Sequence, residues 1–247
     1  MLGLKRSAVR LFPHDPAWEE PALDAIMRLR GVLGHAAQDI QHIGSTSIPH
    51  IAAKPIIDIA VGMGEPDIHV VRHGGKEWRN YVNFRDYLTR RPEEAQLYET
   101  VKLELAARFP GDRAAYTEGK REIISYLLRK ATAWSWLGKK AHIVIDRPVG
   151  HIRRKSGYSL VYPINYGYIP GVLGGDGEYL DVYLLGVSEP VRELDCRVIG
   201  MVHRRNDVED KLIAAPDGMR FTKAEMESAV RFQEQYYDSL VQTADEA

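Results

Sequence analysis

Three carboxylates stand within six positions of the chain, in the run Asp176-Gly177-Glu178-Tyr179-Leu180-Asp181. If this backbone is extended, Asp176 and Glu178 project to the same side, because side chains along a strand alternate with period two. Asp181 joins them only if a turn or bulge separates it from Glu178. Carboxylates packed in this way repel one another unless a cation lies among them, and Mg²⁺ is the hard, oxygen-binding ion that fills this role. The run predicts a magnesium site, and the alternative is an acidic loop solvated by water.

A second acidic run follows in the same half of the chain. Asp207, Glu209 and Lys211 stand at every second position, so an extended segment places two carboxylates and one ammonium on one face, while Asp210 points the other way. Two acids and a lysine on one face suit metal ions beside a phosphate, with the lysine as a point charge on a phosphoryl oxygen. The pattern leaves open whether Glu209 or Asp210 is the ligand. It also leaves open a structural role, in which Lys211 neutralises its neighbours.

The first half of the chain offers a different kind of site, a turn of small residues. Gly44-Ser45-Thr46-Ser47 lies between two strand-like runs, 40–43 and 55–61. Backbone N–H groups at such a turn can bind a phosphate without help from a charged side chain. Lys54 precedes the second run and Asp58 lies within it. The candidate site of this half comprises Gly44, Ser45, Lys54 and Asp58, and the side chains that could line an anion site are Lys54, Arg85, Tyr116 and Lys120. Phosphoryl transfer with two metals would need a second acid at position 60, which is alanine.

The two halves of the chain differ in the secondary structure that their sequences predict. Apolar periodicity and breaks at Pro and Gly predict helices in the first half, at 16–32, 77–89, 93–108 and 113–134. Short alternating runs in the second half predict strands of a small antiparallel barrel, at 141–146, 159–162, 179–185, 195–203 and 211–215. A last helix is predicted from Thr222 to about Thr243, because Thr222 and Glu225 can form a capping box. The change in texture predicts two domains, 1–136 and 137–247.

Composition limits the partners of the protein. The chain has 247 residues and a formal net charge of −1, so no global field draws it to nucleic acid or to an anionic membrane. The single cysteine, Cys196, cannot form an internal disulfide. We find no secretion signal and no apolar run long enough to span a bilayer, so we expect a cytoplasmic protein without membrane or nucleic-acid partners.

The motifs of the second half, with the run 162–169 before them, resemble the soluble inorganic pyrophosphatase family in order and spacing. The resemblance implies a five-stranded Greek-key barrel of the oligonucleotide-binding type, whose cavity holds a phosphoanhydride and several Mg²⁺ ions, with Mn²⁺ as a substitute. The residues it implies as metal ligands are Asp176, Glu178, Asp181, Asp207 and Glu209. Those it implies as contacts to phosphate are Lys211, Tyr166, Tyr236 and the basic pair Arg153 and Arg154.

The resemblance assigns catalysis to three of these positions. Glu178 stands where the family has its general base, and Lys211 and Tyr166 stand beside the reacting phosphate. Two positions depart from the family. Glu178 replaces an aspartate, so the base reaches one methylene further, and Tyr237 replaces a lysine. Fewer cations around the substrate imply weaker binding or a different phosphoanhydride.

The motifs of the first half, 40–49 and 53–61, resemble the GrpB family. The resemblance implies an α/β fold of the nucleotidyltransferase type and a nucleotide as ligand, with Gly44, Ser45, Lys54 and Asp58 as the candidate site. In this sequence the segment between the second strand and residue 68 is shorter than in the family.

Together these patterns predict an α+β protein of two domains, the second a Mg²⁺-dependent hydrolase of pyrophosphate or a related phosphoanhydride. Two alternatives stay open. The first domain could transfer nucleotidyl groups while the barrel removes the pyrophosphate that is released. The chain could instead be a module that binds a nucleotide or phosphate without catalysis. Association with further copies of the chain is compatible with the sequence.

Overall fold

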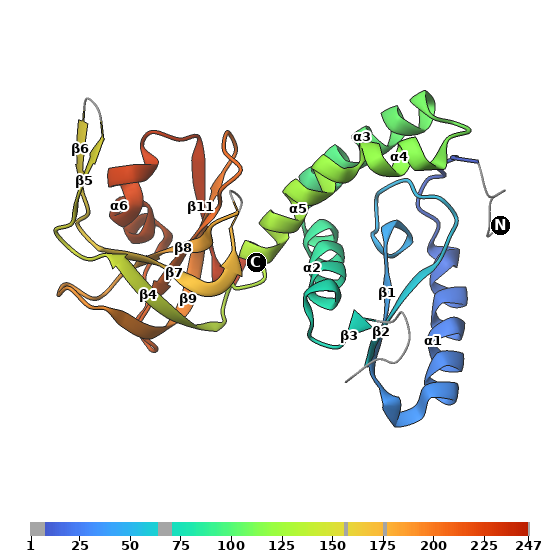
Figure 1. Cartoon of the computed structure of the whole chain (residues 1–247), viewed down its shortest axis with the longest axis horizontal. Coiled ribbons are helices and arrows are strands. Elements are labelled where there is room, and N and C mark those ends of the chain that lie inside the picture. Colours follow the sequence, from blue (N-terminus) through green and yellow to red (C-terminus); the bar gives the residue numbers. More distant parts are fainter. Residues whose placement is uncertain (1–7, 64–70, 156–157, 175–176, 247) are drawn as a thin grey trace. The chain divides into compact units, whose positions relative to one another are not determined.

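The computed structural model describes residues 8–63, 71–155, 158–174 and 177–246, and the candidate ligand Asp176 lies outside these ranges. By its internal contacts the chain divides into two compact units, Met1–Ala131 and Thr132–Ala247 (Figure 1). The predicted boundary at residue 136 stays a prediction. Among the described residues, none of the helices has the length and the apolar run that crossing a bilayer requires.

The first unit is a small sheet with helices packed around it. Strands β1 (Ala37–Ile43), β2 (Asp58–Met63) and β3 (Val71–Arg72) form the sheet in that order, with β1 antiparallel to β2. The helices that pack on it and beyond it are α1 (Glu19–Leu33), α2 (Lys76–Arg90), α3 (Pro92–Arg108), α4 (Arg113–Gly119) and α5 (Arg121–Trp134). In Figure 1, α1 and α2 lie on opposite sides of this sheet. Because β1 and β2 are antiparallel neighbours, the turn that connects them, residues 44–57, lies at one end of the sheet.

Local signals explain where these helices begin. Asp15 caps the turn before α1 by accepting a hydrogen bond from the backbone of Ala17. Asp112 caps α4 in the same way. The predicted single helix at 113–134 is wrong, because α4 ends at Gly119 and α5 begins at Arg121. A Cβ at position 119 would lie 2.5 Å from Cδ2 of Leu105, so glycine lets α4 end against α3 without a shift of that side chain.

The second unit is a sheet that closes on itself. Its strands are β4 (Lys140–Arg147), β7 (Asn165–Leu173), β8 (Tyr179–Leu184), β9 (Glu193–Arg204), β10 (Lys211–Ala215) and β11 (Ser239–Thr243). They follow the order β10-β8-β7-β4-β9-β11, and β10 also pairs with β9, so five of the strands form a ring. Strands β5 (Ile152–Lys155) and β6 (Tyr158–Val161) form a separate hairpin. Buried Ile143, Val182 and Leu212 form part of the core inside the ring.

The C-terminal segment differs from its prediction. The capping box of Thr222 and Glu225 is confirmed, and α6 (Lys223–Glu234) begins there. The helix ends at Glu234 instead of continuing to residue 243, and β11 pairs with β9 along 239–243. The β-branched Val241 and Thr243 favour an extended backbone, and pairing with β9 satisfies backbone groups of that strand which would otherwise be open at its edge. The turn after α6 places Glu234 and Tyr237 beside the end of β9.

Candidate active site

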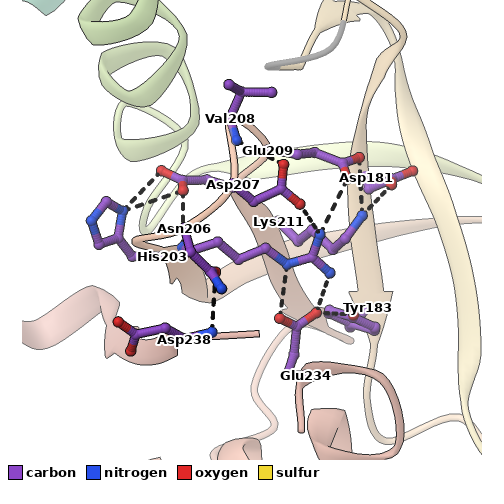
Figure 2. A network of polar contacts seen from close by, with 12 residues as sticks. Asp181, Tyr183, His203, Asn206, Asp207, Val208, Glu209, Lys211, Glu234 and Asp238 are labelled. Atoms are coloured by element: carbon purple, nitrogen blue, oxygen red, sulfur yellow. Dashed lines mark hydrogen bonds and ion pairs between the residues drawn. The ribbon is translucent and has the colours of Figure 1, made fainter. Parts of the chain in front are cut away.

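Strand register brings two of the predicted acids to the same lysine. Strands β8 and β10 run parallel with Leu212 opposite Val182, so Lys211 lies beside Asp181. The ammonium of Lys211 donates to Asp181 Oδ2 at 2.5 Å and lies 3.0 Å from Glu209 Oε1. Glu209 precedes β10 and projects to the same face because it stands two positions before Lys211. Figure 2 shows Asp181, Glu209 and Lys211 converging.

A tyrosine and an arginine extend this group. Tyr166 on β7 is fully buried, and its hydroxyl donates to Asp181 Oδ2 and accepts from Lys211 Nζ at 2.7 Å. The guanidinium of Arg147 lies 4.8 Å from the centre of the Tyr166 ring. The register of β4 against β7 shifts between Ile145 and Arg147, so Asp146 is an extra residue that the bulge re-aims. The group therefore includes β4, β7, β8 and β10.

The NYGY segment of β7 has a packing reason for its glycine. A Cβ on Gly167 would lie 1.9 Å from the carbonyl oxygen of Val144, so only glycine lets β7 approach β4 this closely. This close approach carries Tyr166 to the carboxylates.

A buried arginine connects the acids to α6. Arg204, at the end of β9, is fully buried, and its Nη1 lies 3.0 Å from Asp207 and 3.3 Å from Glu209. On its other side Nε and Nη2 donate to Glu234 at 2.9 and 2.6 Å. Tyr183 donates to the same Glu234 carboxylate at 2.5 Å. Figure 2 shows this network with Glu234 below the loop that carries Asp207 and Glu209.

The electrostatics of the two central acids differ. Burial raises the pKa of Glu209 to about 7, the neighbouring Asp181 carboxylate adds to the rise, and Lys211 opposes it. Burial also acts to raise the pKa of Asp181, but Lys211 and hydrogen bonds from Glu209 and Tyr166 overcome it and hold that pKa below its usual range. The opposite directions of the two pKa shifts reflect a hydrogen bond between the two carboxyl groups, in which Glu209 is the group that holds a proton more readily.

A divalent cation fits this donor set. Asp181 and Glu209 offer hard carboxylate oxygens that approach each other only because a proton or an ammonium lies between them, and a metal ion could replace either. Asp146 is partly exposed, and burial raises the pKa of its carboxyl, with Asp181 adding to the rise. Within the described ranges, no three His, Cys, Asp or Glu side chains form a metal-binding group, and the third acid of the motif, Asp176, lies outside them.

The other predicted residues lie at the edges of this cluster or apart from it. Glu178 is exposed just before β8, and Tyr236 is 68% exposed after α6. Arg153 and Arg154 lie on β5, in the separate hairpin. Asp210 is buried and accepts from the Arg204 backbone at 3.2 Å, on the side away from Lys211. The geometry thus brings together Asp181, Glu209, Lys211, Tyr166 and, through Arg204, Asp207.

Sequence reasoning missed Arg204, Glu234, Asp146 and Arg147. Arg204 stands three and five positions before Asp207 and Glu209, so it is out of phase with the period-two pattern of those acids, and its partner Glu234 is 30 positions away. Asp146 ends a predicted strand, and a bulge that re-aims its side chain leaves no mark in the sequence. The guanidinium of Arg204 lies 3.6 Å from the centre of the Tyr237 ring, a cation–π contact with the residue that departs from the expected lysine.

In the first unit the candidate residues also lie near one another. Gly44 has a φ of 74°, and a Cβ on it would lie 2.5 Å from Asp58 Oδ2, so both backbone and space require glycine. Ser45 shares a hydrogen bond with Tyr98, whose pKa also responds to Asp58. Lys54 lies 5.2 Å from the centre of the Tyr116 ring.

Two family models match the chain, one after the other. Residues 8–68 and 62–130 match the GrpB protein family, and residues 135–242 match the inorganic pyrophosphatase family. The glutamate-rich protein GrpB of Alkalihalophilus pseudofirmus is 28% identical over 173 residues, which cover 53% of this chain and 99% of that protein. A UPF0157 protein of Pseudomonas aeruginosa is 30% identical over 167 residues, covering 51% of this chain and 68% of that protein.

Among solved structures, an inorganic pyrophosphatase of Coxiella burnetii aligns with 43% of this chain and 88% of its own, at 19% identity and a TM-score of 0.36. The family matches confirm both resemblances that the sequence motifs indicate.

Proposed function

Because the chain belongs to the GrpB family and carries a C-terminal domain of the inorganic pyrophosphatase family, we propose that this second domain hydrolyses inorganic pyrophosphate or a related phosphoanhydride with Mg²⁺. We also assign the domain to the Greek-key barrels of the oligonucleotide-binding type. The ring of β4, β7, β8, β10 and β9, with β8 parallel to β10, supports that assignment.

One observation carries the proposal. Carboxylates from β8 and from the loop before β10 meet at Lys211 and Tyr166, so donors for a cation and donors for an anion share one place. A site for a metal phosphate complex needs both kinds of donor. A loop that was acidic only for solubility would hold its carboxylates apart in water, whereas Asp181 and Glu209 share a hydrogen bond.

The reaction forms one P–O bond to a water oxygen and breaks one bridging P–O bond, giving two phosphates. We assign the proton of the attacking water to Glu178, which follows from its place in the motif and from its exposed side chain just before β8. Lys211 and Tyr166 would turn from Asp181 to the oxygens of the phosphoryl group and stabilise the charge that develops there. Arg147, stacked beside Tyr166, would bind the second phosphate.

The metal would bind to Asp181 and Glu209, with Asp207 and Asp176 as further ligands and Mn²⁺ as a substitute for Mg²⁺. When bound, such ions lower the pKa of a coordinated water and neutralise phosphoryl oxygens. Ion binding must then displace Lys211 from Asp181 and Arg204 from Glu209. Because Arg204 keeps its two bonds to Glu234, it can release the acidic loop without leaving its buried position.

The proposal is tested by release of phosphate from pyrophosphate in the presence of Mg²⁺. We compare the wild type with Glu178→Gln and with Glu227→Gln, an exposed glutamate on α6 that serves as the matched control. Hydrolysis by the wild type and by Glu227→Gln, with a loss of about a hundredfold or more in Glu178→Gln, is the expected result. Phosphate release that is equal in wild type and Glu178→Gln would remove Glu178 from catalysis, and no release from the wild type would refute the proposed activity.

A further inference from the structure

Basic side chains gather beside the turn between β1 and β2 in the first domain. Lys54 lies within that connection, residues 44–57, and Lys120 lies between α4 and α5. Their ammonium groups lie 5.2 and 4.6 Å from the centre of the same buried ring, Tyr116. Arg113, the first residue of α4, adds a third positive charge that acts on both lysines. The cluster thus consists of two half-buried ammonium groups that share one aromatic ring, with a guanidinium nearby.

Carboxylates do not balance this charge. Within the described ranges, neither Lys54 nor Lys120 forms an ion pair, and Asp58 is the carboxylate that acts on both of them. The neighbouring Glu99 is occupied, because it accepts a hydrogen bond from the Ala52 backbone at 2.5 Å. Half-buried ammonium groups without partners are costly in a folded protein, and proteins keep them mainly where function requires them.

The titration of the lysines reflects the same crowding. Burial and then Lys54 lower the pKa of Lys120 to about 8. Burial and then Arg113 lower the pKa of Lys54. A bound dianion would offset both causes, so the free domain holds positive charge that a ligand can neutralise.

A third lysine nearby has a structural role. Lys102 is buried, donates to the carbonyl oxygen of Ala52 and lies 5.0 Å from the centre of the Tyr98 ring. These contacts fix the loop that precedes Lys54. Lys102 therefore supports the cluster from behind, while Lys54 and Lys120 stay available.

A cavity includes part of this turn in its lining. It has a volume of about 570 Å³, within the range of small-molecule sites. Its polar lining includes Gly44, Asp58 and, on α2, Glu77 and Asn80, and Tyr81 and Phe84 are among its aromatic lining. Asp58 thus lines the cavity and also acts electrostatically on both lysines.

We propose that the first domain binds a phosphate monoester, with the phosphate between Lys54 and Lys120 and an apolar or aromatic organic group in the cavity. A phosphate dianion matches two ammonium groups in charge, and its oxygens accept from both. The positive φ of Gly44 lets the turn pass close to Asp58, which leaves the lysines free on the side of the ligand.

Calorimetry with phenyl phosphate tests the proposal on the full chain, in a buffer with chelator so that the second domain has no metal to recruit phosphate. We compare the wild type with Lys54→Gln/Lys120→Gln and with Lys76→Gln, an exposed lysine at the start of α2 that removes the same charge elsewhere. Affinity that falls at least tenfold in the double variant and stays unchanged in Lys76→Gln is the expected result. Equal affinity in the double variant and the wild type would overturn the proposal.

Two further measurements test the organic part of the ligand and the role of Lys120. Tyr81→Ala should lower the affinity for phenyl phosphate at least threefold and leave the affinity for inorganic phosphate unchanged, because only the ester reaches the cavity. If both probes bind Tyr81→Ala and wild type equally, the organic part of the proposal is wrong. The melting temperature of Lys120→Gln decides between binding and structure: a value equal to or above that of the wild type supports a binding lysine, and a clear decrease would mean that Lys120 is a packing residue.

Discussion

The two domains treat charge in opposite ways. In the second domain each cation of the polar network meets acids: Lys211 contacts Asp181 and Glu209, and Arg204 contacts Glu234 and the acidic loop. In the first domain Lys54 and Lys120 share one ring and, within the described ranges, have no ion pair. The cations of the second network are paired with acids before any ligand arrives, whereas those of the first cluster are not.

From this difference we infer how a ligand would bind to each domain. A cation that enters the second domain must compete with Lys211 and Arg204 for oxygens, so a metal and a phosphate should bind together, the phosphate accepting the lysine that the metal displaces. An anion that enters the first domain displaces no partner of the lysines. It should therefore bind there without metal.

The largest effect is expected from Asp181→Asn. Asparagine keeps the shape but loses the charge that holds Lys211 and would hold a metal, so the rate of pyrophosphate hydrolysis should fall by roughly a hundredfold to a thousandfold. Phosphate release under saturating Mg²⁺ measures it, with Glu227→Gln as control. A loss smaller than about threefold would place the chemistry outside this network.

Arg204→Met should be the most destabilising change. It leaves Glu234 buried without its partner and frees Asp207 and Glu209 to repel each other, so the free energy of unfolding of the second domain should fall by about 3–5 kcal/mol. Arg205→Met, an exposed neighbour with a long contact to Asp238, should change it by less than about 0.5 kcal/mol. Denaturant unfolding compares the two. Equal losses of unfolding free energy in the two variants would show that the ion pairs of Arg204 do not stabilise the domain.

A smaller effect, with a defined sign, is expected from Lys120→Gln in the first domain. The pKa of Lys120 is about 8 in the folded chain and 10.5 in the unfolded chain, so the unfolded state holds more protons between those values. Stability due to this group therefore rises as pH increases from about 8 to 10.5. Removing the ammonium should stabilise the domain at pH 7 by about 1 kcal/mol, after allowance for solvent, and the gain should vanish near pH 10.

Unfolding curves of the wild type and Lys120→Gln at pH 7 and at pH 10 measure this difference. A gain that is the same at both values would contradict the assigned pKa. A loss at pH 7 would contradict the account of an unmatched charge.

Local patterns predicted part of this arrangement from sequence. The placement of Glu209 and Lys211 on one face follows from period two, and the capping box at Thr222 follows from its spacing, so both could be predicted. Strand β7 was hard to predict as a strand because Gly167, Pro170 and Gly171 are residues that weaken strands. Its glycine is needed for close approach to β4, a reason that only the packed structure reveals.

The features that could not be predicted depend on contacts between residues far apart in the sequence. The end of α6 at Glu234 depends on β11 pairing with β9, and the partnership of Arg204 with Glu234 depends on that end. Lys54, Tyr116 and Lys120 were all named from sequence as residues of an anion site, but the lack of ion pairs around the two lysines could not be predicted. Charge balance is a property of the folded neighbourhood, so a sequence pattern cannot give it.

A crystal structure with Mn²⁺ and a non-hydrolysable pyrophosphate analogue tests the central claim most directly. We expect anomalous peaks at coordination distance, about 2.2 Å, from the carboxylates of Asp181 and Glu209, with Lys211 turned from Asp181 to the analogue. Peaks confined to other parts of the chain, with Lys211 still bound to Asp181, would contradict it.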